Sequence, residues 1–322
     1  MRALRAALAA LGSALSITAC AVVPAAEDPA AAPAPQEVVQ PVVTPASSTA
    51  STQSPAPSPT PTPEPSPTGP TTFVFDGELE QGGWVRGQAP AGTVSARLGE
   101  ETLQLDEEGR FFGAFDRDAG AATQLVATLA DGRTISSPVT VKPRAWNLER
   151  INAPLRPGGG SSEAFMQRRR PELDRIWAAR EKHTGAQGWR QQFMWPVTGR
   201  ISGRFGAQRI YQGEPGSYHT GLDIAPGAGT PFVAPADGVV VLAAPEEFSL
   251  EGKLLIIDHG NGLNSAFLHS SRLLVSEGDT VKQGQQIGNI GSSGRATGPH
   301  LHWSIKWRDA RLDPLLFVGP MN

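Results

Sequence analysis

Short apolar runs separated by glycine constrain the C-terminal part of this chain more than any other feature. Between residues 195 and 318 these runs are three to six residues long and rich in Val, Ile and Leu. Runs of that length, bounded by turn residues, are typical of strands, whereas a helix needs a longer apolar pattern. The pattern predicts a mainly antiparallel β domain with long loops and little helix. The strands are expected at residues 232–234, 238–242, 253–257, 264–269, 286–290 and 301–305.

A second set of strand-like runs lies upstream, in residues 71–142. About seven short runs with Gly and Asp turns between them predict a small Ig-like β-sandwich. This segment contains no histidine and no cysteine, so we expect it to be a spacer or a weak binding module rather than a catalytic domain. The strands are expected at residues 73–75, 84–87, 93–98, 101–105, 111–115, 124–129 and 138–141.

Residues 143–194 are predicted to be a connector with a short helix. Ser161 or Ser162 is a suitable N-cap, and an intermittent apolar stripe continues to about residue 182. Pro171 is expected to split this helix into two pieces. The run of three arginines at 168–170 is interpreted as a solvated face. His183, next to Gly185 at the helix end, is interpreted as structural.

The first 70 residues have a composition that does not build a domain. Residues 1–19 combine a positive start with a short apolar run, which predicts a signal peptide. Residues 20–70, rich in Pro, Ala, Ser and Thr, are predicted to be a disordered tether. The only cysteine, Cys20, stands where the lipobox of bacterial lipoproteins has its acylated cysteine. That resemblance implies a lipid anchor on Cys20; the alternative is an ordinary signal peptide with an incidental cysteine.

The charge balance argues against one class of partner. The chain has 28 Lys and Arg against 31 Asp and Glu, a net charge of -3. This balance leaves no basic surplus for a nucleic acid backbone, and we expect no nucleic acid partner.

Histidines and one aspartate form two clusters that carry the chemistry. His300 and His302 alternate with other residues in a strand-like run, so their side chains are expected on one face. His219 and Asp223 lie four residues apart around Gly221, a spacing that means little by itself. Nitrogen and oxygen ligands of this kind suit zinc, and three protein ligands leave a position for water. The alternative interpretation of His302 is a structural histidine in the core. His259 is interpreted as a turn residue.

An ordered series of motifs gives these clusters a context. Residues 195–318 resemble the lysostaphin/LytM-type zinc peptidase family of peptidoglycan endopeptidases. The resemblance rests on Trp195-Pro196-Val197, Gly203-Arg204-Phe205-Gly206, His219-Thr220-Gly221-Leu222-Asp223, Pro235-Ala236-Asp237-Gly238, His259-Gly260-Asn261-Gly262, Phe267-Leu268-His269, Gly291-Ser292-Ser293-Gly294 and Gly298-Pro299-His300-Leu301-His302.

The resemblance implies a zinc (Zn²⁺) cofactor and a residue set. The zinc ligands fall on His219, Asp223 and His302, and the two unligated active-site histidines on His269 and His300. In that interpretation His300 would take a proton from the zinc-bound water or orient that water, while His269 would stabilise the oxyanion or protonate the leaving amine; the sequence does not fix which of the two does which.

Two flanking features complete the expected groove. Tyr211 and Tyr218, the only tyrosines, are candidates either for donating to the oxyanion or for forming an aromatic wall. Residues 207–218 and 244–252 are expected to be loops that line the groove.

The implied function is hydrolysis of peptide bonds in peptidoglycan cross-links or stem peptides by a zinc-dependent endopeptidase. The alternative is an idle LytM-type module that activates a cell-wall amidase, because the family contains members that lost their metal ligands. All five core positions are present here, which favours the enzyme. The implied partners are peptidoglycan, a membrane through Cys20, and an amidase or divisome protein. The implied location is the cell envelope, facing the periplasm or the exterior, and Ala21 after Cys20 fits outer-membrane sorting.

Overall fold

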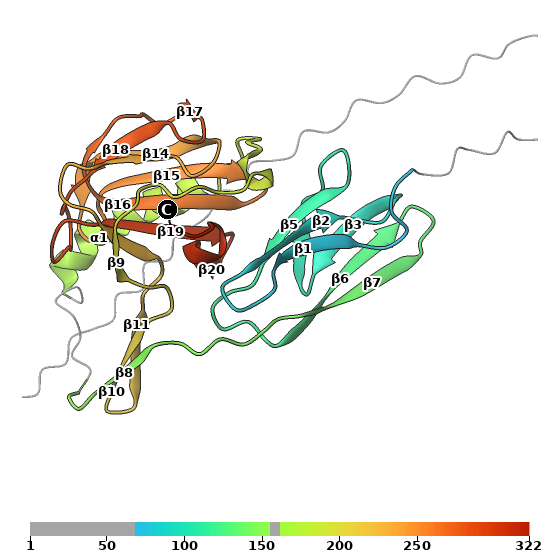
Figure 1. The fold of residues 1–322 in the computed structure, drawn as a ribbon, viewed down its shortest axis with the longest axis horizontal. Coiled ribbons are helices and arrows are strands. Elements are labelled where there is room, and N and C mark those ends of the chain that lie inside the picture. Colours follow the sequence, from blue (N-terminus) through green and yellow to red (C-terminus); the bar gives the residue numbers. More distant parts are fainter. Residues whose placement is uncertain (1–67, 155–161, 322) are drawn as a thin grey trace, which may run out of the picture. The chain divides into compact units, whose positions relative to one another are not determined.

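The computed structural model describes residues 68–154 and 162–321 and is mainly β (Figure 1). The predicted signal peptide, Cys20 and nearly all of the tether lie outside the described residues. Within those two ranges there is one α-helix, and no helix is long and apolar enough to cross a membrane. The predicted fold class, mainly β with a C-terminal antiparallel sheet, is confirmed.

Seven strands form in residues 74–140, as the sequence predicts. They pair in two antiparallel sheets, β1-β2-β5 and β4-β3-β6-β7. Alternation is clearest in β6, where Leu125, Ala127 and Leu129 are buried and the residues between them are more exposed. The bounds are β1 Val74–Glu78, β2 Trp84–Gln88, β3 Thr93–Leu98, β4 Glu101–Leu103, β5 Arg110–Ala114, β6 Ala122–Leu129 and β7 Thr134–Thr140.

A ten-stranded antiparallel sheet forms the C-terminal domain. Its main path runs β17-β14-β15-β16-β19-β12-β9; β18 pairs with β16 and β13, and β20 with β19. Its long central strands are buried almost throughout because both faces of the sheet are covered. The bounds are β9 Arg200–Gly203, β12 Leu222–Ala225, β13 Pro231–Val233, β14 Gly238–Phe248, β15 Gly252–Gly260, β16 Leu263–Leu273, β17 Thr280–Val281, β18 Gln286–Ile290, β19 Leu301–Trp307 and β20 Ala310–Leu312.

A three-stranded sheet joins the connector to the peptidase-like region. β8 (Leu148–Ile151) runs parallel to β10 (Gln208–Tyr211), which forms a hairpin with β11 (Glu214–Tyr218). Arg209 and Glu149 form an ion pair across β10 and β8 at 2.8 Å. The prediction of a loop at 207–218 was wrong, and β8 adds a strand to the connector. Segment 244–252 is likewise the end and turn of the β14–β15 hairpin.

Helix α1 (Glu163–Arg180) is continuous and capped by Ser162. The predicted break at Pro171 does not occur, because tertiary packing holds the helix: Ile176 and Ala179 are buried against apolar residues of β14 and β15. Arg169 corrects a second prediction. It is only 6% exposed, so the arginine run is not simply a solvated face.

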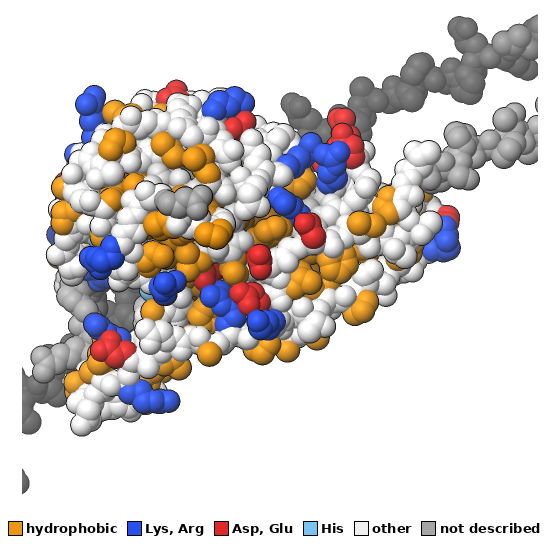
Figure 2. All heavy atoms as spheres, in the orientation of Figure 1, with side chains coloured by type: hydrophobic (Ala, Val, Ile, Leu, Met, Phe, Trp, Pro, Cys, Tyr) orange, Lys and Arg blue, Asp and Glu red, His pale blue; other side chains and the backbone are white. Residues whose placement is uncertain are grey.

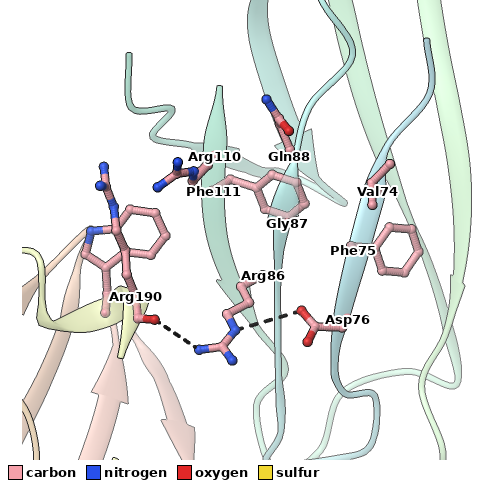
Figure 3. Close-up of a pocket in the computed structure, with 10 residues that line it drawn as sticks. Val74, Phe75, Asp76, Arg86, Gly87, Gln88, Arg110, Phe111 and Arg190 are labelled. Atoms are coloured by element: carbon pink, nitrogen blue, oxygen red, sulfur yellow. Dashed lines mark hydrogen bonds and ion pairs between the residues drawn. The ribbon is translucent and has the colours of Figure 1, made fainter. Parts of the chain in front are cut away.

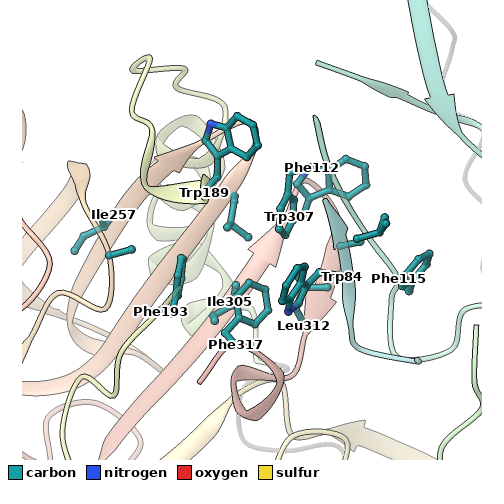
Figure 4. Packing of buried hydrophobic residues seen from close by; sticks show 14 of the residues in the cluster. Trp84, Phe112, Phe115, Trp189, Phe193, Ile257, Ile305, Trp307, Leu312 and Phe317 are labelled. Carbon is teal, nitrogen blue, oxygen red and sulfur yellow. The ribbon is translucent and has the colours of Figure 1, made fainter. Parts of the chain in front are cut away.

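The two β domains share one apolar core (Figure 4). Trp84 and Phe112 pack against Phe317 with ring centroids 5.8 and 6.4 Å away, and Phe112 also meets Trp307 at 6.5 Å. The Trp84 indole donates to the carbonyl of Leu316, in the short 3-10 helix η3 (Pro314–Leu316), at 2.8 Å. Residues 71–142 are therefore packed on the C-terminal domain, which the spacer interpretation did not anticipate.

Candidate active site

Sheet register brings three of the predicted site residues together. Asp223 of β12 is the direct partner of His302 on β19, and His219 lies just after β11. His219 Nε2 and His302 Nδ1 lie 3.0 and 2.9 Å from Asp223 Oδ1 and 3.1 Å from each other. Asp223 and His302, 79 positions apart in the sequence, thus meet because they lie opposite each other on neighbouring strands.

The donor set fits a zinc ion. The ligand atoms of His219, Asp223 and His302 all lie within 4.8 Å of one another. Two imidazole nitrogens and a carboxylate oxygen suit tetrahedral zinc, whose bonds of about 2.0–2.1 Å place neighbouring ligands about 3.3 Å apart. The carbonyl of Arg204 lies 3.0 Å from His219 Nδ1, so this nitrogen carries the proton and Nε2 faces the cluster.

Two glycines make room for this cluster. A Cβ at Gly221 would lie 2.5 Å from the Trp303 carbonyl oxygen and 2.6 Å from His302 Nε2. A Cβ at Gly203 would lie 2.3 Å from Asp223 Oδ2. Any side chain at either position would displace a candidate ligand, which explains why glycine stands there.

Mutual electrostatics set the protonation of the cluster. Burial by itself would raise the pKa of Asp223, but hydrogen bonds from His219 and His302 hold that pKa well below its usual range. Burial opposes the charged form of His219, yet the bond to Asp223 raises its pKa. For His302 burial wins and lowers the pKa. The cluster therefore holds an ionised carboxylate, the form that binds a cation.

His269 and His300 form a second imidazole pair beside the cluster. Their ring centroids are 4.8 Å apart, and His300 Nε2 lies 3.7 Å from Asp223 Oδ1. The Nδ1 atoms face carbonyls, of Ser293 for His269 and of Gly298 for His300, each at 2.8 Å. Since a carbonyl only accepts, both Nδ1 atoms carry the proton and both Nε2 atoms keep a lone pair. Burial lowers the pKa of His269.

A β-bulge sets the backbone conformation of His269. Opposite Lys253 and Leu255 of β15 stand Ser270 and Phe267 of β16, so β16 carries one extra residue between them. His269 lies in this bulge with φ +64°, a left-handed conformation that costs a non-glycine residue about 1 kcal/mol. Strain of this kind persists only where surrounding contacts hold it.

A cavity of about 670 Å³ opens next to His219 and Asp223. Segment 207–218 contributes to its wall as predicted, whereas 244–252 does not. Connector residues, which sequence reasoning did not connect with the site, form another part of the wall. The lining comprises Asn147, Glu149, Ala207, Gln208, Arg209, Tyr211, Gly216, Ser217, Tyr218, His219, Asp223 and Arg295.

The two tyrosines differ in their surroundings. Both line the cavity, but the Tyr218 hydroxyl accepts from Arg311 at 3.4 Å and its ring lies 4.6 Å from the guanidinium of Arg117. Arg117 comes from residues 71–142, is 5% exposed, and also donates to Gly206 and Gln208. The N-terminal β domain therefore supports the wall of the cavity. These contacts favour the groove-wall role for Tyr218.

The remaining described histidines lie apart from this site. His259 is at the end of β15, not in the following turn as predicted, and is fully buried. Its nitrogens contact the Asp237 carbonyl at 2.8 Å and the Ser265 hydroxyl at 2.9 Å, and burial lowers its pKa to about 4. His183 lies exposed beyond the end of α1.

Another hollow, of about 430 Å³, lies on the N-terminal β domain and next to the 3-10 helix η2 (Gly188–Arg190) (Figure 3). Arg86 in its wall is engaged, since it lies 3.8 Å from Asp76 and donates to the Arg190 carbonyl at 3.4 Å. Basic and acidic side chains are also interspersed over the face shown in Figure 2. The hollow contains none of the predicted site residues.

A β-sheet domain that gathers two histidines and an aspartate beside two further histidines has the arrangement of a metallopeptidase. Residues 217–314 match the model of peptidase family M23, and the chain carries a domain of this family, of the LytM type.

Relatives of two kinds each match part of this chain. The peptidoglycan DD-endopeptidase ShyA of Vibrio cholerae is 39% identical over 123 residues, which are 38% of this chain and 28% of ShyA. The lipoprotein NlpD/LppB homolog of Pseudomonas aeruginosa is 37% identical over 131 residues, 41% of this chain and 40% of the relative. Each match thus spans less than half of the relative's length. A crystal structure of a peptidase M23 from Pseudomonas aeruginosa superposes with a TM-score of 0.56 at 26% identity, covering 74% of this chain and 94% of that one.

Proposed function

We propose that this protein is a zinc-dependent endopeptidase that hydrolyses peptide bonds in peptidoglycan cross-links or stem peptides. The observation that carries the proposal is the convergence of His219, Asp223 and His302 within 4.8 Å, with His269 and His300 beside them. The similarity to ShyA, whose name gives a peptidoglycan DD-endopeptidase activity, supports the substrate class.

In this proposal His219, Asp223 and His302 hold zinc. When bound, zinc lowers the pKa of a water molecule to about 7 and polarises a carbonyl. His300, with its Nε2 lone pair 3.7 Å from Asp223, is placed to take a proton. His269, fixed through Nδ1 on Ser293, is placed to stabilise the oxyanion or to protonate the leaving amine. The opposite assignment, in which His269 takes the proton and His300 stabilises the oxyanion or protonates the amine, fits the same geometry, because both imidazoles present an unprotonated Nε2.

The cavity beside the cluster gives the substrate a place to bind. Its wall includes Arg295 and the paired Glu149 and Arg209. A groove with charged side chains in its wall suits an extended peptide with charged groups, and the segments that form it would select which bond is cut.

The cellular setting is a second part of the proposal. A lipid on Cys20 would anchor the protein to a membrane, with the tether carrying the peptidase domain through the cell envelope to peptidoglycan. The similarity to a lipoprotein NlpD/LppB homolog supports this setting, and Ala21 fits the outer membrane.

A murein hydrolase activator is the competing function. Murein hydrolase activator NlpD of Salmonella typhimurium is 35% identical over 124 residues, 38% of this chain. An activator of this kind would bind a cell-wall amidase or divisome protein. The complete set of two metal-ligating and two further histidines with Asp223 favours the enzyme, because an activator requires none of them.

Zinc removal and restoration test the proposal. The purified full chain is analysed for zinc and incubated with isolated peptidoglycan, and new amino termini are counted before chelation, after chelation and after zinc is added back. We expect about one zinc per chain and activity that is lost and then restored. A zinc-loaded chain that releases no amino termini, yet accelerates a purified cell-wall amidase, would replace the enzyme with the activator.

A further inference from the structure

The turn between β14 and β15 connects helix α1 with the candidate catalytic histidine. On one side, Glu251 accepts two bonds from Arg169 of α1, from Nη1 and Nη2, each at 2.6 Å. Glu172, one helical turn after Arg169, accepts from the amide and the hydroxyl of Ser249 at 2.8 and 2.7 Å. Both ends of the turn are therefore fastened to the same face of the helix.

On its other side, the same turn holds the bulge of β16. The carbonyl of Glu251 accepts from the amide of His269 at 2.9 Å. Lys253 N donates to the hydroxyl of Ser293 at 2.9 Å, and the carbonyl of Ser293 accepts from His269 Nδ1 at 2.8 Å. Both the backbone and the ring of His269 thus depend on the position of residues 251–253.

Burial makes the helix contact stiff. Arg169 is 6% exposed, and its fork binds the Glu251 carboxylate with two parallel bonds, which fixes orientation as well as distance. The Glu251 side chain is 15% exposed, so the pair is largely shielded from water, and breaking it leaves a poorly compensated charge. By contrast, the ion pair of Arg175 with Glu246, on the same helix and the same hairpin, is about half exposed on both sides.

We propose that Arg169 and Glu251 form a positioning pair that holds His269 in its strained, bulged conformation. Resting on the proposed function, this makes helix α1 part of the peptidase, although it lies before the segment that matches the family. Neither residue touches the candidate zinc ligands, so the pair acts through the backbone of the β14–β15 turn. The prediction is a fall in turnover without loss of metal.

The experiment compares three arginine variants of the full chain. Arg169→Gln removes the fork, Arg169→Lys keeps the charge but not the two parallel bonds, and Arg175→Gln is the matched control on the exposed pair. In peptidoglycan digestion we expect kcat of Arg169→Gln to fall about 10- to 100-fold, since a displacement near 1 Å can cost that much. KM and zinc content should stay within about twofold, Arg169→Lys should lie between, and Arg175→Gln should equal wild type.

A second measurement does not depend on activity. Amide hydrogen exchange of the peptide that contains His269 should be faster in Arg169→Gln than in wild type and Arg175→Gln, while peptides from β6 exchange alike in all three. Glu251→Gln, which keeps the shape of the side chain, should show the same change to a smaller extent and guards against a misfolded arginine variant.

The outcomes are separable. Faster exchange at His269 with a selective fall in kcat supports the positioning pair. Equal losses in Arg169→Gln and Arg175→Gln, loss of zinc, or unchanged exchange would overturn it. If the wild type itself releases no amino termini, the proposed function fails, but the exchange measurement still decides whether the pair holds His269.

Discussion

His302 on β19 and His259 on β15 belong to one sheet, and burial lowers the pKa of both. His259 is sealed: its nitrogens contact a carbonyl and a hydroxyl, and the ring of Phe193 lies 4.9 Å away. His302 instead contacts the Asp223 carboxylate and a second imidazole, and His219 and Asp223 line an open cavity. Burial therefore does not distinguish a ligand from a core histidine.

What distinguishes them is the charge that each one faces. A neutral carbonyl and a hydroxyl satisfy an imidazole fully, leaving no lone pair for a cation. A carboxylate held ionised by two imidazoles leaves lone pairs that converge on one point. The comparison predicts that losing His302 removes metal and activity, whereas losing His259 affects only stability.

His302→Ala carries the largest expected effect. It removes one of three candidate ligands, so zinc affinity should fall by more than about 100-fold, beyond the cost of losing an outer-shell partner, and peptidase activity should disappear. Metal analysis after dialysis against a zinc buffer measures the first, and release of amino termini from peptidoglycan the second. If this variant kept its full zinc content, His302 would not be a metal ligand and would not differ from His259 in this respect.

His300→Ala should separate proton transfer from metal binding. His300 lies beside the cluster at 3.7 Å from Asp223 rather than within it, so the variant should keep its zinc. Loss of a group that transfers a proton costs about 10²- to 10⁴-fold, and kcat should fall in that range. If His300→Ala lost zinc while His302→Ala kept it, the ligand and the proton-transfer residue would have to be exchanged.

Much of this site could be predicted because it follows local rules. Period-two alternation places His300 and His302 side by side, and the short apolar runs at 238–242 and 253–257 are strands in the structure. The His219 and Asp223 pair is visible in the sequence, but only the resemblance gave it a ligand role and added His269; the structure brings all three within reach of the other two. Their catalytic and ligand roles remain predictions until the variants above are measured.

The parts that could not be predicted depend on distant contacts. The bulge at His269 exists because the β14–β15 turn holds it, and no pattern in residues 264–269 reveals an extra residue. Arg169 reads as one of three exposed arginines until Glu251, 82 residues later, is placed against it. β8 is recognisable only once the β10–β11 hairpin offers it an edge. Each case needs tertiary structure that overrides local preference.

Gly221→Ala should produce an intermediate effect on the candidate metal site alone. The added Cβ would lie 2.6 Å from His302 Nε2 and 2.5 Å from the Trp303 carbonyl, so the ring or the strand must shift. We expect zinc affinity to fall about tenfold, in the range of altered ligand orientation. Gly120→Ala, where a Cβ meets nothing within 4 Å, is the control; equal affinities in the two variants would show that the cluster tolerates the displacement.

His259→Gln has the smallest expected effect, and it tests the interpretation of His259 as a buried structural histidine. Because burial lowers the folded-state pKa of His259 from 6.5 to about 4, the folded protein favours the neutral ring and the unfolded chain binds the extra proton. The stability that this provides is complete above pH 6.5 and is lost as pH falls toward 4, up to about 3 kcal/mol.

Urea unfolding between pH 7 and 4 measures this contribution. The wild type should lose more free energy of unfolding over that interval than His259→Gln, and zinc content should be equal in both. The same slope in His259→Gln as in wild type would mean that the buried imidazole does not resist protonation, because it is the burial of its neutral ring that makes His259 link folding to pH in this range.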